Sequence, residues 1–413
     1  LMLSSFPVER IKYMLDISDT KLLICDNIPS GLVQSGVSCR VCEIPGGELD
    51  EYVDRPVSDT GLFNVHFTSG STGRPKGVMI SHRSMSNLYA MVKELIEPYD
   101  GRFLCSTQTV FDCFVVETLV AIAIGRTVVF ADSEEMMLPW KLAQLMEKYD
   151  TGIFEMTPSR LGLYFKNEEF CRAASKIRLL MVGGEVLNKP LLDKFYQHSN
   201  GTLLNMYGPS EATVYTTMGV IPKDGYITIG SQVMNTRVYV VDENLKPVIP
   251  TAVGELCVAG ESLSIGYVSS AELTEKSFVD DIFMPGSKMY RSGDLVRLRA
   301  DGTFDYIGRK DSQVKLNGQR VELSEITCAI ENTGLVKQAA TVAVRNADAT
   351  MQLYSFYSSE TKDEIKEDIH KSISKILPDY MIPSVIVQLE ELPVTATNKI
   401  DLKKLQEGTV IIR

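Results

Sequence analysis

Short apolar runs alternate with amphipathic stretches through the first half of the chain. The runs predict strands at residues 127–130, 152–156, 178–182 and 202–206. Apolar positions at helical spacing predict helices between these strands, at residues 141–148 and 189–197. Strands that alternate with helices are typical of an α/β domain, in which helices pack on the faces of a sheet.

From Gly219 onward the pattern changes to short strands. These are expected at residues 237–241, 254–258, 295–299 and 303–307. The turn Ala300-Asp301-Gly302 joins the last two strands as a hairpin. The α/β core is therefore expected to carry a small β-rich subdomain.

The pattern changes once more near Asp311. Asn317-Gly318 is a strong two-residue hairpin signal between runs 313–316 and 319–323, and an amphipathic helix is expected from Ser324. Further strands are predicted at residues 339–345, 352–357 and 384–389, with a charged helix at 362–376. These elements predict a compact α+β domain at residues 311–413, joined by a short hinge to a core at residues 1–310.

One loop has the composition of a phosphate-binding site. Residues 68–77 read Thr-Ser-Gly-Ser-Thr-Gly-Arg-Pro-Lys-Gly, between predicted strands at 62–67 and 77–80. Glycines allow the backbone to approach an anion, while hydroxyls, N–H groups and a lysine can donate to phosphate oxygens. The candidates are Thr68, Ser69, Gly70, Ser71, Thr72, Gly73 and Lys76. The spacing differs from that of P-loop NTPases, and the alternative is a flexible Ser/Gly turn.

Composition limits the function classes. The chain has 413 residues, 44% of them hydrophobic, and a net charge of −11, which argues against a general nucleic-acid surface. The most apolar run, residues 115–125, carries a glutamate and is too short to span a bilayer. No Cys or His cluster suggests a zinc site or a histidine triad. A cytoplasmic enzyme without a membrane partner is expected.

Several motifs follow one another along nearly the whole chain. They include Phe6-Pro7-Val8-Glu9-Arg10-Ile11, Phe111-Asp112, Tyr207-Gly208-Pro209-Ser210-Glu211, Tyr290-Arg291-Ser292-Gly293-Asp294-Leu295, Gln313-Val314-Lys315 and Asn398-Lys399-Ile400-Asp401. With the loop at 68–77, this ordered set resembles the adenylate-forming superfamily, and specifically the adenylation domains of nonribosomal peptide synthetases. The family has a longer segment before the loop than the 67 residues found here, so an N-terminal truncation is expected.

The resemblance implies a fold and a reaction. The fold is a partial α/β core with a β-rich subdomain and a small, mobile α+β C-terminal domain. The reaction joins ATP and an amino acid into aminoacyl-AMP and pyrophosphate, and then passes the acyl group to a phosphopantetheine thiol on a carrier domain. By resemblance, Lys399 lies between the substrate carboxylate and the nucleotide, Glu211 binds Mg²⁺ and Asp311 is the hinge.

The resemblance also implies the nucleotide contacts. Tyr207 offers a flat face for adenine, and Gly184, Glu185 and Asn205 line its edge. Asp294 suits the ribose hydroxyls because a carboxylate can accept two hydrogen bonds. Tyr306 and Arg309 are the family's neighbouring contacts. The alternatives are a core aromatic for Tyr207 and a surface ion pair for Asp294 and Arg309.

The family's substrate-pocket positions can be transferred one by one. They fall on Asp112, Cys113, Val116, Glu155, Met181, Gly183, Met206, Val214, Tyr215 and Lys399. Asp112 implies a substrate with an α-amino group, because a carboxylate pairs with an ammonium that fatty and aryl acids lack. A D-alanine–carrier ligase, an acyl-CoA ligase of the same superfamily and a truncated, non-catalytic remnant remain as alternatives.

Glu155 is the unusual pocket residue. A buried glutamate among apolar side chains is costly unless it is paired, so a substrate with a distal cation, such as ornithine or lysine, is the natural partner. In the alternative, Glu155 turns aside to a backbone or arginine partner, and the pocket takes isoleucine or valine.

Overall fold

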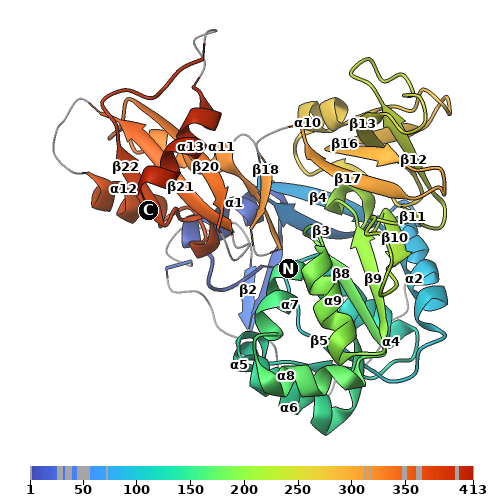
Figure 1. The fold of residues 1–413 in the computed structure, drawn as a ribbon. Coiled ribbons are helices and arrows are strands. Elements are labelled where there is room, and N and C mark those ends of the chain that lie inside the picture. Colours follow the sequence, from blue (N-terminus) through green and yellow to red (C-terminus); the bar gives the residue numbers. More distant parts are fainter. Residues whose placement is uncertain are drawn as a thin grey trace. The chain divides into compact units, whose positions relative to one another are not determined.

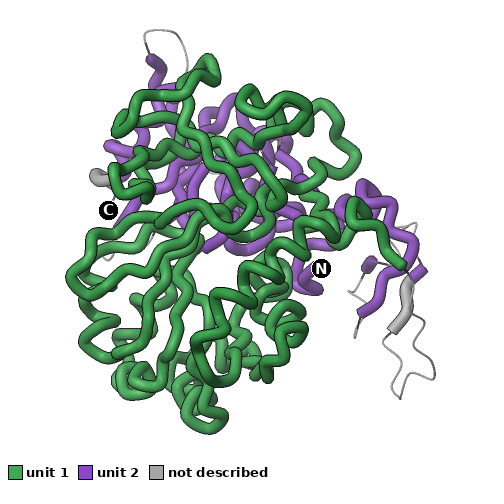
Figure 2. Tube along the Cα trace, turned by 90° about the vertical axis from the view of Figure 1, so that its right-hand side faces the viewer, with its two compact units in different colours: residues 1, 56–66, 78–311 green, residues 2–55, 67–77, 312–413 purple. Residues whose placement is uncertain are grey.

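The computed structural model describes residues 2–25, 31–32, 40–43, 56–70, 73–310, 313–316, 318–346, 351–359, 365–395 and 400–412. Two compact units divide the chain (Figure 2). The first contains Pro56–His66 and Val78–Asp311, and the second contains Met2–Arg55, Phe67–Gly77 and Ser312–Arg413. The domain division expected at residues 310 and 311 stays a prediction.

A seven-stranded sheet forms the centre of the first unit (Figure 1). Its strand order is β11-β10-β9-β8-β7-β5-β6, with β5 to β9 parallel and the other two antiparallel to their neighbours. The strands are β5 (Arg102–Cys105), β6 (Val128–Phe130), β7 (Thr151–Met156), β8 (Leu179–Gly183), β9 (Thr202–Tyr207), β10 (Thr217–Val220) and β11 (Ser231–Gln232). The four strands expected at residues 127–206 are confirmed.

Separate apolar cores cover the two faces of this sheet. Ile153 and Phe154 are neighbours on β7 but belong to different cores, because successive strand residues point to opposite faces. All six residues of β7 are buried, as in a parallel sheet covered on both sides. The longer helices are α2 (His82–Ile96), α6 (Pro139–Tyr149), α7 (Pro158–Tyr164), α8 (Glu168–Ala173) and α9 (Lys189–His198). The helices expected at residues 141–148 and 189–197 are therefore confirmed.

The region after β5 contains a helix type that the sequence did not predict. A π-helix (Val116–Val120) lies between α3 (Cys113–Val115) and α4 (Ala121–Ala123). Such wide turns occur frequently at functional sites. Its Glu117 is fully buried.

The β-rich subdomain is a five-stranded sheet in the first unit. Its order is β12-β13-β16-β15, and β17 also pairs with β16. The strands are β12 (Thr236–Val241), β13 (Val253–Gly260), β15 (Phe278–Asp280), β16 (Lys288–Leu298) and β17 (Phe304–Arg309), with α10 at Ala271–Ser277. The predicted hairpin between β16 and β17 is confirmed, and Gly302 has the positive φ of +82° that its turn needs. The start of β16 was predicted wrongly at residue 295, because the polar residues 291–294 conceal an alternation of buried and half-buried positions.

A smaller sheet holds the candidate loop. Its order is β14-β4-β3, formed by β3 (Leu62–Thr68), β4 (Lys76–Ser81) and β14 (Gly266–Tyr267). Ser81 caps the start of α2, since its hydroxyl accepts the Ser84 N–H at 3.0 Å.

The second unit is a mixed α+β structure. The expected hairpin, β18 (Gln313–Leu316) and β19 (Gln319–Glu322), precedes α11 (Leu323–Glu331). A three-stranded sheet follows, formed by β20 (Gln338–Arg345), β21 (Met351–Ser358) and β22 (Val385–Gln388), with α12 at Lys366–Ile373 and α13 at Leu402–Ile412. The unit also contains α1 (Val8–Ile17), β1 (Leu22–Cys25) and β2 (Arg40–Glu43). Its largest core packs α11 and α12 on the sheet through residues such as Ile326, Ile369 and Met381.

Within the described part of the chain, no helix combines the length and apolar character that crossing a membrane requires.

Candidate functional site

The glycines of the candidate loop are required by its geometry. A side chain at Gly70 would place Cβ 2.1 Å from the carbonyl oxygen of Arg74, far inside van der Waals contact. Gly73 has a φ of +82°, and its N–H donates to the Gly70 carbonyl at 3.2 Å. The loop is therefore a tight turn, and its other two candidates, Ser71 and Thr72, lie outside the described residues.

The remaining donors of the loop differ in how they are used. Thr68 ends β3, and its hydroxyl is buried without a hydrogen-bond partner among the described residues. The Ser69 hydroxyl donates to the Arg320 carbonyl at 2.6 Å, and the Gly70 N–H donates to the Glu325 carboxylate at 3.1 Å. Lys76 begins β4. A buried hydroxyl without a partner is the kind of group that a ligand oxygen would satisfy.

Three predicted nucleotide contacts converge on the carboxylate of a fourth, Asp294. Tyr207 donates to Asp294 Oδ2 at 2.6 Å, while Tyr306 and Arg309 Nη1 donate to Oδ1 at 3.1 and 3.0 Å. Arg309 lies opposite Asp294 in the pairing of β16 with β17. The side chains of Asp294 and Arg309 are only 7% and 12% exposed, so the surface ion pair considered as an alternative is excluded. Burial, followed by the charge of Asp294, raises the pKa of Tyr207 well above its ordinary value, which keeps its hydroxyl a donor.

The other predicted adenine-edge residues follow β8 and lie on β9. Gly184 comes directly after β8 with a φ of +82°. The Glu185 carboxylate accepts the Ser159 N–H and hydroxyl, both at 2.9 Å. Asn205 on β9 donates to the Thr228 carbonyl at 2.7 Å. These contacts fix the ends of the parallel strands, the edge at which ligands bind in open α/β sheets.

The predicted substrate-pocket residues meet at this edge of the sheet. Five of them belong to one buried apolar cluster with Cys113 packed against it: Val116, Met181, Met206, Val214 and Tyr215. Val214 has a φ of +70°, a costly conformation for a β-branched residue that is typical of functional sites. A side chain at Gly183 would place Cβ 3.1 Å from the Met206 carbonyl oxygen and 3.6 Å from Glu155 Oε1, so this glycine lies directly beside the carboxylate.

Asp112 stands at the start of α3. Its Oδ1 accepts the Cys113 N–H at 2.9 Å, and its Oδ2 accepts the Ser210 hydroxyl at 2.5 Å. Ser210 was not among the predicted site residues, although it belongs to the motif at residues 207–211. Asp112 therefore retains lone pairs on both oxygens for another donor.

Glu155 on β7 is buried and bonded to another predicted pocket residue. The Tyr215 hydroxyl donates to its Oε2 at 2.5 Å, and Oε1 makes no hydrogen bond within the described part of the chain. The alternative in which Glu155 turns to a backbone group or an arginine is therefore not what the structure shows. Burial raises the pKa of Glu155 to about 8, which the Tyr215 hydrogen bond opposes and the charges of Glu117 and Asp112 reinforce.

A second buried carboxylate lies behind Glu155 and was missed. Glu117 of the π-helix accepts the Glu155 N–H at Oε1 (3.2 Å), and the N–H groups of Ser106 and Thr107 at Oε2 (3.1 and 3.0 Å). Burial raises the pKa of Glu117 to about 7, against the opposing effect of these hydrogen bonds. The available signal was the single glutamate within the apolar run at residues 115–125.

Glu211 lies in a short 3₁₀ helix (Ser210–Ala212) and is fully buried. Its Oε1 accepts the Tyr267 hydroxyl at 2.7 Å. Mg²⁺ commonly takes one or two protein carboxylates together with substrate phosphates, so a single glutamate fits this role. The described residues contain no group of three or more His, Cys, Asp or Glu suited to a metal. The predicted Lys399 and Asp311 lie outside the described residues.

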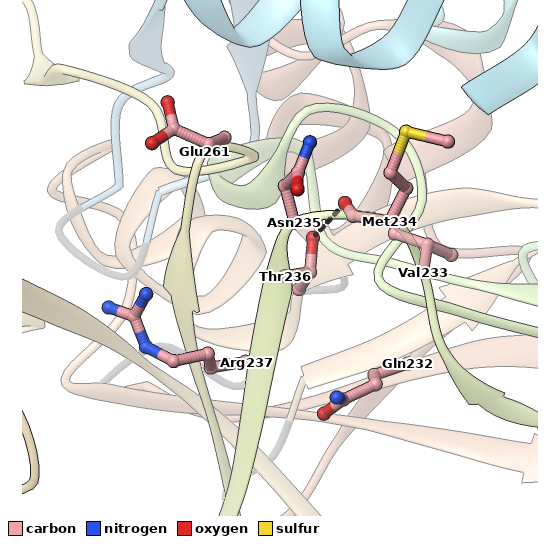
Figure 3. Close-up of a pocket in the computed structure, with 7 residues that line it drawn as sticks. All are labelled: Gln232, Val233, Met234, Asn235, Thr236, Arg237 and Glu261. Carbon is pink, nitrogen blue, oxygen red and sulfur yellow. Dashed lines mark hydrogen bonds between the residues drawn. The ribbon is translucent and has the colours of Figure 1, made fainter. Parts of the chain in front are cut away.

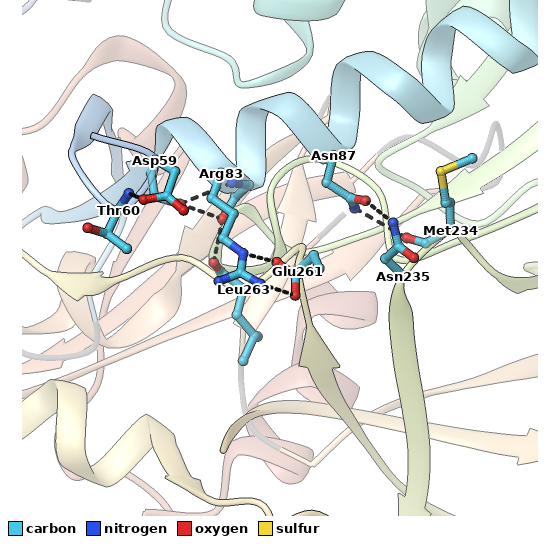
Figure 4. A network of polar contacts seen from close by, with 10 residues as sticks. Asp59, Thr60, Arg83, Asn87, Met234, Asn235, Glu261 and Leu263 are labelled. Carbon is cyan, nitrogen blue, oxygen red and sulfur yellow. Dashed lines mark hydrogen bonds and ion pairs between the residues drawn. The ribbon is translucent and has the colours of Figure 1, made fainter. Parts of the chain in front are cut away.

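One cavity lies away from these residues. It has a volume of about 450 Å³ and is lined by Gln232–Arg237 and Glu261 (Figure 3). On its border, Arg83 of α2 donates to Glu261 at 2.7 Å, and Asn87 bonds with Asn235 at 2.9 Å (Figure 4). This network joins α2 to the β-rich subdomain and contains none of the predicted site residues.

Comparison with known sequences finds a family and relatives. The profile of the family described as "AMP-binding enzyme" matches residues 2–268. A dimodular nonribosomal peptide synthase of Bacillus subtilis (strain 168) is 34% identical over 420 residues, covering 97% of this chain and 17% of that protein. Tyrocidine synthase 3 of Brevibacillus parabrevis is 35% identical over 413 residues, covering 98% and 6%. The chain thus spans a small part of the length of these relatives.

Solved structures show similar folds. An NRPS protein containing adenylation and PCP domains, in its holo form with a vinylsulfonamide inhibitor, has a TM-score of 0.81 at 26% identity, covering 97% of this chain and 69% of that one. An o-succinylbenzoate CoA synthetase from Bacillus subtilis has a TM-score of 0.84 at 17% identity, covering 98% and 83%, a likeness of fold alone. Because proteins with differently described functions share this fold, the fold alone does not decide the substrate.

Proposed function

Because the chain belongs to the AMP-binding enzyme family, with the fold of adenylation domains, we propose that it activates an amino acid with ATP. The reaction gives aminoacyl-AMP and pyrophosphate, and the acyl group then passes to the phosphopantetheine thiol of a carrier domain. The observation that supports an amino acid substrate is Asp112, a carboxylate with free lone pairs next to the apolar cluster that contains most of the predicted pocket residues. An α-ammonium is the natural partner for such a group.

The nucleotide would bind across the carboxyl ends of β8 and β9. The Asp294 carboxylate, held by Tyr207, Tyr306 and Arg309, would accept a ribose hydroxyl. The buried Thr68 hydroxyl would donate to a phosphate oxygen. Glu211 would hold Mg²⁺, which would neutralise charge on the phosphates.

The substrate side chain is proposed to be cationic. Glu155 keeps one oxygen without a hydrogen bond among the described residues, and this oxygen lies next to Gly183. The second buried carboxylate, Glu117, adds negative charge at the same end of the pocket. An ornithine or lysine ammonium would pair with Glu155, whereas isoleucine or valine would leave Glu155 unpaired.

Two roles rest on the family motifs alone. Lys399 would donate to the carboxylate and the α-phosphate as charge develops between them, and Asp311 would act as the hinge. A carrier domain as acceptor is in line with a structural relative described as containing adenylation and PCP domains. A cytoplasmic location stays a prediction.

Exchange of labelled pyrophosphate into ATP tests this proposal. The protein would be assayed with each proteinogenic amino acid, ornithine, fatty acids and aryl acids, since exchange requires a substrate that forms an adenylate. We expect exchange with ornithine or lysine and none with the other acid classes. Exchange with a fatty or aryl acid, and with no amino acid, would point to an acyl-CoA ligase; no exchange with any acid would point to a non-catalytic remnant.

A further inference from the structure

The Gly70 N–H in the candidate phosphate loop is already bonded to an anion of the protein itself. It donates at 3.1 Å to Oε2 of Glu325, which lies on α11 and is fully buried. A backbone N–H in a glycine-rich loop is the donor that a phosphate oxygen would use. The carboxylate therefore occupies a position suited to phosphate.

The other oxygen of Glu325 is bound just as firmly. Arg10 Nη1 of α1 contacts Oε1 at 2.8 Å, and the side chains of Arg10 and Glu325 are only 5% and 0% exposed. A buried ion pair of this kind is strongly destabilised when one partner is removed. Arg10 belongs to the motif at residues 6–11, to which the proposed reaction gives no role.

Two more contacts bring the same segment of the second unit against the loop. The Ser69 hydroxyl donates to the Arg320 carbonyl, so its proton is already bonded within the protein. A side chain at Gly73 would place Cβ 2.9 Å from Cβ of Cys328 on α11. Residues 320–328 therefore accept hydrogen bonds from the loop. They also lie closer to it than a side chain at Gly73 would permit.

We propose that the Glu325 carboxylate takes the place of a nucleotide phosphate on this loop, so that packing of α11 on the loop and binding of phosphate exclude each other. Release of pyrophosphate then frees the Gly70 N–H for Glu325. This makes Glu325 a positioning residue for the step that follows adenylation, with Arg10 holding its charge in place. The inference rests on the phosphate-binding role proposed for the loop.

The test uses variants that separate this role from simple stabilisation. Arg10→Met/Glu325→Gln removes both charges together and leaves no buried charge unpaired. Glu325→Asp keeps a charge for Arg10 but is one methylene too short to hold both contacts. Glu367→Gln, on the exposed surface of α12, removes a charge of the same sign as a control.

Two measurements are made on each protein. Calorimetric titration with pyrophosphate and Mg²⁺ reports the affinity of the loop, and single-turnover transfer from aminoacyl-AMP to free pantetheine reports the second step. If α11 occupies the loop about nine-tenths of the time, releasing it tightens pyrophosphate binding about tenfold. We expect tighter pyrophosphate binding and slower transfer in Arg10→Met/Glu325→Gln and in Glu325→Asp. Neither change is expected in Glu367→Gln.

The outcomes distinguish the possible explanations. If Glu325 has a purely structural role, its variants should have a lower melting temperature. Both pyrophosphate binding and acyl transfer should then weaken together. Unchanged or weaker pyrophosphate binding, in variants that melt like the wild type, would overturn the inference. If wild-type protein binds pyrophosphate but shows no exchange dependent on an amino acid, the proposed substrate class fails and the inference stands. If it does not bind pyrophosphate at all, the inference is rejected with the phosphate role of the loop.

Discussion

At the scale of single residues, the pocket places two carboxylates of different character in one apolar cluster. Asp112 has hydrogen bonds on both oxygens from groups that leave room for an ammonium. Glu155 has one from Tyr215 and lies in front of Glu117. Two buried carboxylates cost free energy unless a cation pairs with them, and this requirement lets a site select a cationic substrate.

Exchanging Glu155 should therefore change which amino acid is accepted. In Glu155→Gln, we expect kcat/KM for ornithine or lysine to fall at least about a hundredfold, because an unpaired buried charge costs several kcal/mol. Isoleucine and valine should change less than about threefold, because their apolar side chains form no ion pair with Glu155 that the substitution could remove. Pyrophosphate exchange over all amino acids measures this, with the exposed Glu168→Gln as the matched control. Equal losses for every amino acid would show that Glu155 supports the fold and does not select the substrate.

The raised pKa of Glu155 predicts a pH dependence with a definite sign. In the folded protein its pKa is raised from 4.5 to about 8, so between these values the native state holds a proton that the unfolded state has lost. This contribution to the free energy of unfolding is complete below pH 4.5 and is lost as the pH rises to about 8. Over a window of about 2.5 pH units, from about pH 6 to about pH 8.5, the melting temperature should therefore fall less in Glu155→Gln than in the wild type. Ornithine should stabilise the wild type more at the higher pH, because the carboxylate is then ionised. The opposite slope would mean that Glu155 is charged in the empty pocket.

At the scale of elements, strong periodic patterns were sufficient to predict strands and hairpins. The sequence pattern did not predict the strand that contains polar residues of the candidate site. Buried strands such as β7 and the β18–β19 hairpin follow from apolar runs and from Asn317-Gly318. The first half of β16 was missed because Arg291 and Asp294 are polar residues that are paired inside a sheet. Tertiary partners determine such positions, and no local pattern encodes them.

In the candidate site, too, the sequence predicted some residues and missed those that depend on tertiary contacts. The motifs identified Asp294, Tyr207 and Glu155, and the structure brings each into a buried polar contact. Glu117 was not identified, because its function depends on a π-helix that directs it toward three backbone N–H groups. A single glutamate in an apolar run carries no spacing signal that reveals such partners.

Substitution of Gly73 tests whether the candidate phosphate loop contacts the nucleotide. Gly73→Ala introduces a side chain at positive φ and pushes it against Cys328, whereas Gly286→Ala introduces the same strain at a φ of +85° with nothing within 4 Å. Both should lose about 1–2 kcal/mol of stability. Only Gly73→Ala should alter the loop, raising KM for MgATP about tenfold or more. Steady-state kinetics and urea unfolding of the two variants measure the difference. Equal KM values in both would show that the loop does not contact the nucleotide.

At the scale of the whole molecule, the two half-reactions make opposite demands on one carboxyl carbon. Adenylation needs the Lys399 cation beside that carbon, and thioester formation needs space there for the phosphopantetheine arm, so we expect the C-terminal domain to move about Asp311. The residue before this position is anchored within the first unit. The Lys310 N–H donates to the Gly293 carbonyl at 2.9 Å, and its ammonium lies 3.1 Å from Glu255, a carboxylate that is 4% exposed. An anchored residue directly before a pivot confines rotation to the bonds that follow it.

Substitutions at the two positions should therefore separate the half-reactions. Asp311→Pro fixes φ at the proposed pivot and should leave adenylate formation within about threefold of the wild type while slowing acyl transfer tenfold or more, by about 1.4 kcal/mol in barrier height. Lys399→Ala should do the reverse and reduce adenylation by about 10²–10³, the effect expected when a dedicated oxyanion donor is lost. Rapid-quench single-turnover measurements, started either from ATP and amino acid or from preformed aminoacyl-AMP, separate the two steps. Lys403→Ala, on the exposed side of α13, controls for charge loss near Lys399. Should Asp311→Pro slow both steps equally, the position supports the fold of the chain and does not act as its pivot.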